Sequence, residues 1–313
     1  MSRSPSYSDG MDTVSPEERA ALVALLQVRP RGMGWGEITG EVVEAGSALD
    51  VWHRLVPPAL VHPPGEVDPL EAASRDIQSW TDQGHTVLTI LDGHYPERLR
   101  AVHQAPPILF ARGSLVPGDR AVSVVGSRAA SDRGLDIATS VARELVSRNI
   151  TVVAGLAVGI DTAAHRAALD AGGRTVAFIA TGINKVYPAA NRDLHQEIST
   201  HGLLFSQFWP DAPPQKRNFL MRNATMSGYG MATVVVEAGE HSGARAQARM
   251  AVEHGRPVIL TDLVVGKNAW AQALVNRPGV HVASSLQQVL AVVGGLLSEE
   301  SIIDADLRRL VST

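Results

Sequence analysis

A short glycine-bearing loop that follows an apolar run in this sequence has residue types suited to binding a phosphate group. Gly126, Ser127 and Arg128 come directly after the run 121–125. Glycine lets a phosphate approach the backbone, serine and main-chain amides donate hydrogen bonds, and arginine supplies a charged fork. A tight turn with an exposed arginine explains these three residues equally well.

A second loop, 154–161, ends one apolar run and opens a helix. Gly155 and Gly159 permit close approach of a ligand to the backbone, and Asp161 can cap the helix N-terminus. Asp161 and His165 lie four residues apart and therefore share a helical face. Because no serine or cysteine nucleophile stands in a recognisable elbow, capping is favoured over catalysis. No catalytic residue is predicted.

Later loops carry the remaining candidate residues. Gly182 and Lys185 could contact a backbone phosphate, and Tyr187 could stack on a base or equally pack the turn. The other candidates are Asn191 at the start of a helix, Arg222 and Asn223 within 216–229, and Ser242 and Gly243 after a run that ends at Glu237. Several phosphate-sized sites fit a polyanion better than one mononucleotide, because each site needs its own donors.

Signatures of other binding chemistries are missing from the sequence. No Gly-x-Gly-x-x-Gly follows the first apolar run, and neither the nucleotide-hydrolase glycine loop nor a His-Glu-x-x-His helix occurs. The chain has no cysteine, which excludes disulfides and thiolate metal sites. We therefore predict no cofactor and no bound metal.

The elements that position these loops are strands alternating with helices. This order is typical of βαβ units around a parallel sheet, in which ligands bind outside the carboxyl ends of the strands. The sequence predicts an α/β fold: an extended Rossmann-like, doubly wound, mostly parallel sheet with a small N-terminal helical domain. The expected strands are 86–91, 121–126, 151–156, 175–180, 203–206, 233–237, 257–260 and 280–283.

The pattern along the chain divides it into parts. We expect a disordered tail at 1–14, a helical module resembling a sterile-alpha-motif or helix-hairpin unit at 15–56, a proline-rich linker at 57–69, the sheet domain at 70–297 and a short segment at 298–313. Ser15, Pro16 and Glu18 predict a capping box at the start of the module. The partner of this module could be DNA backbone, another protein or only the main domain.

Composition restricts the class of ligand. The formal net charge is −4 and aromatic residues make up 4% of the 313 residues, so a nucleic-acid surface must be a local patch with few stacking platforms. Neither a signal peptide nor a spanning segment is evident, and the expected location is cytoplasmic with no membrane contact.

The motifs together resemble the DNA-processing protein A (DprA/Smf) family over roughly 75–292. The resemblance rests on the order of several runs: Tyr95-Pro96-Glu97-Arg98-Leu99, the segment 106–113, Val124-Val125-Gly126-Ser127-Arg128, the segment 155–169, Gly172-Gly173-Arg174-Thr175, Tyr187-Pro188-Ala189-Ala190-Asn191, Arg222-Asn223, Val235-Val236-Glu237-Ala238 and Ser242-Gly243.

The resemblance implies a non-enzymatic homodimer that binds and protects single-stranded DNA and hands it to the recombinase RecA during natural transformation. It makes Arg128 the first candidate for a phosphate contact, followed by Lys185, Arg222 and Asn223. Val158 and Ala224 stand where the family tends to have basic residues, which implies fewer phosphate contacts and a flatter salt dependence. A C-terminal winged-helix domain, frequent in the family, is not expected.

A second function stays open beside DNA binding. The wider superfamily contains nucleotide-sensing and phosphoribohydrolase (LOG-type) proteins, in which the same rim holds a nucleotide, and Glu237 could then serve ribosyl-bond cleavage. The Pro-Gly-Gly-x-Gly-Thr loop of the phosphoribohydrolases is missing after the run 233–237. A role in defence against foreign DNA is compatible with either function.

Overall fold

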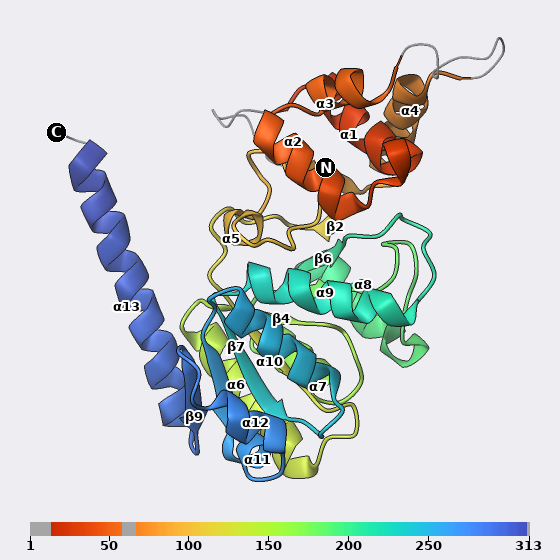
Figure 1. Ribbon diagram of the computed structural model, residues 1–313. Helices are drawn as coiled ribbons and strands as arrows, with labels where there is room; N and C mark the ends of the chain where they lie inside the picture. The colour runs from red at the N-terminus through yellow and green to blue at the C-terminus, as the bar shows by residue number, and fades with distance from the viewer. Residues whose placement is uncertain (1–13, 58–66, 312–313) are drawn as a thin grey trace, which may run out of the picture. The chain divides into compact units, whose positions relative to one another are not determined.

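The computed structural model describes residues 14–57 and 67–311, and they fold into two compact units (Figure 1). The first unit comprises residues 1–95 and 106–109, and the second comprises 96–105 and 110–313. The first unit therefore extends past the expected linker at 57–69, because the helix and strand that follow this segment pack with the N-terminal helices. The expected tail lies, except for Val14, outside the described residues, as do positions 58–66 of the expected linker.

The first unit is mainly helical. Its elements are α1 (Pro16–Val28), η1 (Pro30–Gly32), α2 (Trp35–Ala45), α3 (Ala48–Leu55), α4 (Pro69–Asp82) and β1 (Thr86–Thr89). Leu22, Leu25 and Leu26 of α1 are almost completely buried, since their spacing places them on one face of the helix. The N-terminal helical module is thus present, with α4 and β1 added to it.

The capping of α1 differs in part from the predicted box. Ser15 Oγ accepts a hydrogen bond from Glu18 N at 3.2 Å, as expected. The Glu18 carboxylate instead accepts bonds from Ser47 Oγ and Ala48 N, both at 2.6 Å, and from Leu49 N at 3.2 Å. The first turn of α3 offers this carboxylate three donors, whereas the Ser15 backbone offers one, so Glu18 caps the third helix rather than its own.

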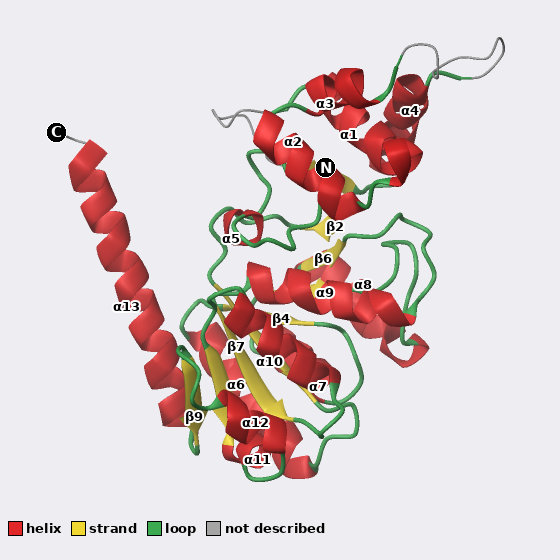
Figure 2. Ribbon diagram, viewed as in Figure 1, coloured by secondary structure: helices red, strands yellow, loops and turns green. Residues whose placement is uncertain are grey.

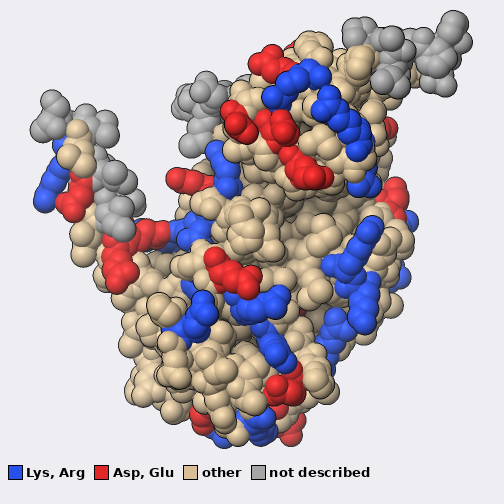
Figure 3. Space-filling view, viewed as in Figure 1, with Lys and Arg blue, Asp and Glu red and all other residues tan. Residues whose placement is uncertain are grey.

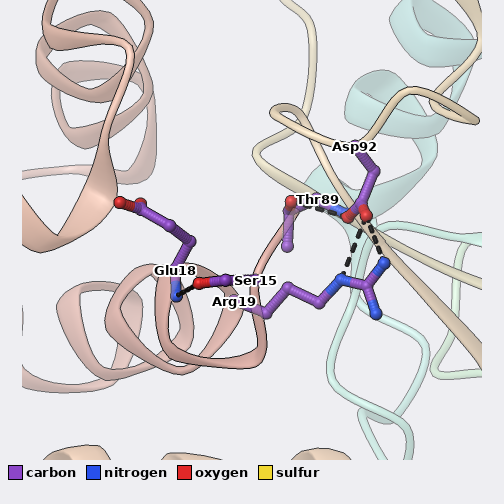
Figure 4. A network of polar contacts seen from close by, with 5 residues as sticks. All are labelled: Ser15, Glu18, Arg19, Thr89 and Asp92. Carbon is purple, nitrogen blue, oxygen red and sulfur yellow. Dashed lines mark hydrogen bonds and ion pairs between the residues drawn. The ribbon is translucent and has the colours of Figure 1, made fainter. Parts of the chain in front are cut away.

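A buried carboxylate ties α1 to the end of β1, as Figure 4 shows. Asp92 accepts hydrogen bonds from Thr89 N and Thr89 Oγ1, both at 2.7 Å, and forms an ion pair with Arg19. The Asp92 side chain is 2% exposed and is satisfied on both oxygens, as a buried carboxylate must be. These contacts lie wholly within the first unit.

The strands of the second unit form a mostly parallel sheet, which confirms the predicted α/β class (Figure 2). In space they follow the order β2-β6-β5-β4-β3-β7-β8-β9. Only the pairing of β2 with β6 is antiparallel within this series. Their bounds are β2 (Ile108–Gly113), β3 (Ala121–Gly126), β4 (Thr151–Ala154), β5 (Thr175–Phe178), β6 (Leu203–Ser206), β7 (Ala232–Glu237), β8 (Val258–Thr261) and β9 (Val280–Ala283).

The predicted strands match this sheet closely, with one omission. β3, β6 and β9 have the expected bounds, and the others differ by a few residues at their ends. β2 was not among the expected strands, although the segment 106–113 contributes to the family resemblance. Its pairing with β6 is a contact across more than 90 residues of sequence, which local patterns do not reveal.

Helices cover both faces of the sheet. Alternate side chains of a strand point to opposite faces, and Val122 and Val124 join the apolar cluster formed with α6 (Asp132–Ser147), α7 (Ile160–Asp170) and α13 (Leu286–Val311). On the other face, α9 (Lys216–Tyr229) packs against α10 (Gly243–Glu253). The remaining helices are α5 (Glu97–Arg100), η3 (Ala189–Asn191), α8 (Arg192–His201), α11 (Asp262–Val265) and α12 (Ala269–Leu274).

The expected boundary at residue 297 falls inside a continuous helix. α13 runs from Leu286 to Val311, and Glu300 forms ion pairs with Arg98 and with Arg120, the latter at 3.4 Å. These pairs hold the middle of the helix to the second unit, so no separate segment begins at 298. Among the described helices, none combines the length and apolar character that crossing a bilayer would require.

Candidate nucleic-acid interface

The principal cavity of the second unit lies where the winding of the sheet reverses. After β3 the chain builds β4, β5 and β6 on one side, and β7 then returns to the other side of β3. Ligands of doubly wound sheets bind at such a switch point, beyond the carboxyl ends of the strands. The cavity has a volume of about 570 Å³ and is lined by Val125, Gly126, Ser127, Arg128, Ala129, Ala157, Asp161, Phe219, Arg222, Asn223, Met226, Gly239, His241, Ser242, Gly243, Ala244 and Gln247.

The first loop of the cavity is held tightly at Gly126. A Cβ atom there would lie 2.6 Å from Ile160 Cγ1 and 2.7 Å from the carbonyl oxygen of Glu237. Ser127 Oγ accepts a hydrogen bond from Ala129 N at 3.1 Å, which closes the turn. Only glycine therefore allows the end of β3 to pass between these neighbours and present Arg128.

Arg128 combines exposure with an absence of charge partners. Its guanidinium lies 5.3 Å from the ring centroid of Phe219, a cation–π distance. Within 14–57 and 67–311 it forms no ion pair, and its main-chain N–H donates to no other residue. Arg128 can therefore offer an anion both a main-chain donor and a side-chain donor without breaking an existing salt bridge.

Arg222 places a second cation at the cavity wall, and this one is buried. The residue is 6% exposed, and its Nη1 donates to the carbonyl oxygen of Phe178 at 3.0 Å. Burial lowers the pKa of Arg222, and nearby Asp161 opposes that shift. A Cβ atom at position 155 would lie 1.3 Å from Arg222 Nη1, so Gly155 makes room for this guanidinium.

Asp161 occupies the amides that the second loop was expected to offer to phosphate. Its Oδ2 accepts hydrogen bonds from Gly155 N at 3.0 Å and from Ala157 N at 3.3 Å. Burial raises the pKa of Asp161, while Arg222 and these amides oppose the rise. The side chain thus shapes the loop before α7 and does not cap the helix as expected, since the N-cap residue of α7 is Gly159 and no side chain caps it.

His165, on the same helical face, is fully buried. Its Nδ1 lies 2.6 Å from Thr175 Oγ1. Burial, with a smaller contribution from Arg222, lowers the pKa of His165 to about 3. The imidazole is therefore neutral at physiological pH and packs between α7 and the sheet.

Most of the predicted site residues meet at this cavity, and some do not. Its lining includes Gly126, Ser127, Arg128, Asp161, Arg222, Asn223, Ser242 and Gly243. Gly155 instead lines a neighbouring cavity of about 100 Å³, together with Arg128, Val158, Tyr187 and Phe219. Gly159, at φ +82°, lies behind the first loop, where a Cβ would be 2.3 Å from Ser127 O.

Besides Gly159, three predicted residues are not among those that line either cavity. Lys185 forms an ion pair with Asp211 at 3.1 Å. Asn191 is buried, and its Nδ2 donates to Leu156 O and Thr162 Oγ1, both at 2.9 Å, so it supports the second loop from behind. Gly182 packs against the backbone of Trp209.

The larger cavity is also lined by Phe219, His241 and Gln247, which were not predicted from the sequence. For Phe219 a signal existed, because it precedes Arg222 by three residues and Asn223 by four. On a helix this spacing places the three side chains on one face. His241 and Gln247 carry no such local signal.

Glu237, considered for ribosyl-bond cleavage, is not among the residues that line the cavity. Its Oε2 accepts hydrogen bonds from Ser131 N and Ser131 Oγ, both at 2.9 Å. The carboxylate therefore holds Ser131, the N-cap residue of α6, behind the first loop. Among the residues that the structure describes, no group of three or more His, Asp or Glu side chains could hold a metal ion.

The charge distribution agrees with a local cationic site. On the face seen in Figure 3, basic side chains form small groups separated by acidic ones, as a net charge of −4 requires. The cavity brings together Arg128, Arg222 and a single carboxylate, Asp161. With a net charge of −4, attraction for an anion must come from local groups of basic side chains such as this one rather than from a field over the whole molecule.

Comparisons with known proteins place these features in a family. A family model described as DNA recombination-mediator protein A matches residues 86–293. The chain is 34% identical over 186 residues to the DNA processing protein DprA of Bacillus subtilis, covering 59% of this chain and 63% of that protein. It is 38% identical over 206 residues to the DNA processing protein DprA of Streptococcus pneumoniae, covering 65% and 72%.

A third relative is the putative DNA processing protein DprA of Mycobacterium tuberculosis, 35% identical over 242 residues, or 72% of this chain and 62% of that protein. The chain thus spans somewhat less than two thirds of the length of the Bacillus and Mycobacterium proteins.

Solved structures show the same fold. The crystal structure of the Streptococcus pneumoniae DNA processing protein A is 30% identical, with a TM-score of 0.68 over 90% of this chain and 98% of that one. The Helicobacter pylori protein, whose structure concerns its single-stranded DNA binding mode, is 22% identical with a TM-score of 0.59, over 69% of this chain and 96% of that one. At that identity the second likeness concerns the fold alone.

Proposed function

Because the chain belongs to the DNA recombination-mediator protein A family, we propose that it binds single-stranded DNA without catalysing a reaction, in the cavity beside Arg128 and Arg222. The observation that carries the proposal is the pairing of an exposed, unpaired Arg128 with the buried Arg222 at the switch point of the sheet. A phosphate at the cavity mouth would receive hydrogen bonds from Arg128, and the field of Arg222 would strengthen them.

The cavity also has the components to hold a base. Phe219 contacts Arg128 on one side and Tyr187 on the other, with the two aromatic ring centroids 5.7 Å apart. Aromatic rings accept any base by stacking, and unstacked bases are available in single strands. A phosphate donor beside an aromatic ring supports a single-stranded ligand over a duplex.

The proposal includes what the DNA is bound for. We infer a homodimer that protects single-stranded DNA and delivers it to the recombinase RecA, as the family name supports. A RecA-loading assay on DNA coated with a single-strand binding protein tests this part. Faster RecA filament formation in the presence of the protein is the expected result, and an unchanged rate contradicts it.

A paired titration tests the site itself. Fluorescence anisotropy with labelled oligothymidine is expected to show binding whose affinity falls steeply with salt, because bound phosphates release counterions. Unlabelled thymidine monophosphate and ATP are expected to compete poorly, since each offers only part of the polymer's contacts. Tight binding of a mononucleotide without binding of the oligonucleotide would establish the nucleotide-sensing alternative instead.

The substitution Arg128→Ala identifies the phosphate contact. It is expected to weaken binding equally for oligonucleotides of different sequence and to reduce the salt slope by about 0.7, the value for one single-strand phosphate contact. Arg148→Ala is the matched control. Arg148 follows α6 at the amino-terminal ends of the parallel strands, away from the cavity, and it pairs with Glu144 at 2.5 Å. Equal effects of the two variants would remove Arg128 from the interface.

A further inference from the structure

We propose that Glu237 is the positioning residue of the phosphate-binding loop 126–131, and that its carboxylate orders this loop while opposing the anion that the loop binds. The inference rests on the proposed function and adds a residue outside the cavity lining. It gives one side chain two effects of opposite sign on DNA affinity. Those effects can be separated by substitution.

Glu237 holds both ends of the loop that presents Arg128. Its carbonyl oxygen accepts a hydrogen bond from Ser127 N at 2.7 Å, on one side of Arg128. Its Oε2 accepts bonds from Ser131 N and Ser131 Oγ, both at 2.9 Å, on the other side. The loop between these two attachment points contains only Arg128, Ala129 and Ala130.

The space for the carboxylate is reserved by a glycine. A Cβ atom at Gly134 would lie 2.2 Å from Glu237 Oε2, so alanine at this position would displace the carboxylate. Glycine inside a helix costs roughly 1 kcal/mol relative to alanine. Ser131 already caps α6 through Gly134 N, which donates to Ser131 Oγ at 3.1 Å. The carboxylate is therefore not needed to cap the helix, and its distinct effect is to restrain Ser131.

The carboxylate also carries a charge that disfavours an anion nearby. It lies at the N-terminus of α6, where it offsets the positive end of the helix dipole. Glutamine would keep the oxygen that accepts from Ser131 while removing the charge. Alanine would remove both. Glu237→Gln is thus expected to raise the affinity for DNA, and Glu237→Ala, which also loses the contact that orders the loop, is expected to lower it.

The experiment measures the affinity of the full chain for labelled oligothymidine in five forms: wild type, Glu237→Gln, Glu237→Ala, Gly134→Ala and the double variant Gly134→Ala/Glu237→Ala. Glu237→Gln is expected to bind several-fold more tightly than wild type. Glu237→Ala and Gly134→Ala are each expected to bind several-fold more weakly. In a chain that already carries Glu237→Ala, Gly134→Ala is expected to cause no further loss of DNA affinity, because the carboxylate that it would displace is absent.

A role limited to folding predicts a different pattern. In that case both Glu237 variants would lower stability in proportion to their affinity, and neither would bind more tightly than wild type. Urea midpoints of all forms therefore accompany the titrations. An affinity of Glu237→Gln equal to or below that of wild type overturns the proposal, and this comparison decides the matter even if an alanine variant fails to fold.

Failure of the proposed function would look distinct from failure of this inference. If wild type binds no oligothymidine even at low salt, the DNA-binding proposal is wrong and Glu237 has no such site to position. If wild type binds and the variants match it, only the positioning role is overturned.

Discussion

The two helix layers that cover the sheet of the second unit bury different kinds of side chain. The layer of α6, α7 and α13 buries aliphatic residues such as Val141, Leu145 and Ile160 against the strands. α9 in the other layer buries polar side chains as well: Arg222 and Asn223 are 6% and 7% exposed, while Leu220 is 50% exposed. The arrangement of α9 cannot be explained by apolar burial alone.

The difference between the layers indicates which one is less stable than it could be because it forms a binding site. Burying a cation and amides costs free energy unless each finds partners, whereas burying aliphatic side chains is favourable throughout. The polar side chains of α9 lie where the chain needs donors at the rim of the cavity. We therefore expect substitutions in the first layer to change stability and those in the second to change binding.

The largest expected effect is on stability in the apolar layer. Leu145 is completely buried, so Leu145→Ala should lower the free energy of unfolding by about 2–5 kcal/mol. Urea denaturation measures the loss. Leu220→Ala is the matched control and should cost far less, and a similar loss from both would contradict the contrast between the layers.

The next effect is on binding through the polar layer. The double variant Asp161→Asn/Arg222→Leu removes a buried cation together with the carboxylate that it faces. Such replacements are often neutral or stabilising for the fold. The loss of the cation whose field strengthens the hydrogen bonds between Arg128 and the phosphate should still weaken DNA binding on the order of tenfold. Retained affinity with a large loss of stability would reverse the assignment of α9.

A smaller effect concerns the pH dependence of stability. The pKa of His165 is about 3 in the folded chain and 6.5 as the reference, so below pH 6.5 the unfolded chain takes up a proton that the folded chain refuses. Between pH 6.5 and 5 this should cost about 2 kcal/mol, at roughly 1.4 kcal/mol per pH unit. His165→Leu should remove that part of the pH dependence.

Urea midpoints at pH 7 and pH 5 check this prediction. His281→Leu serves as the control, because His281 is exposed on β9 and should leave the pH dependence as in wild type. An unchanged slope in His165→Leu would mean that this imidazole is accessible to protons in the folded protein.

The smallest expected effect is a gain of affinity. Val158 is 37% exposed and lines the smaller cavity beside Arg128. Val158→Lys should add one phosphate contact and steepen the salt slope by about 0.7. Val116→Lys is the control: it makes the same change of charge in the segment before β3, at the amino-terminal end of that strand. A slope unchanged by the first variant would mean that DNA does not pass Val158.

Much of the fold could be predicted from the sequence because its signals are local. Short apolar runs marked β3, β6 and β9 at their observed bounds, and glycines marked the loops after β3 and β4. β2 escaped prediction because its partner, β6, lies far along the chain. The division between units also depended on contacts, since α4 resembles the start of a new domain until its packing against α1 is known.

The order of strands and loops, and the residue types at the strand ends, can be predicted from the sequence alone. Secondary-structure propensity and hydrophobic periodicity depend on only a few neighbouring residues. Which charged side chains lie close together depends on the tertiary structure. It brought Arg128 and Arg222 to one cavity and paired Lys185 with Asp211. In the folded chain the amides of the second loop donate hydrogen bonds to Asp161, and Glu237 lies behind the first loop. Charges interact through space rather than along the chain, so their partners follow from the fold and not from spacing in the sequence.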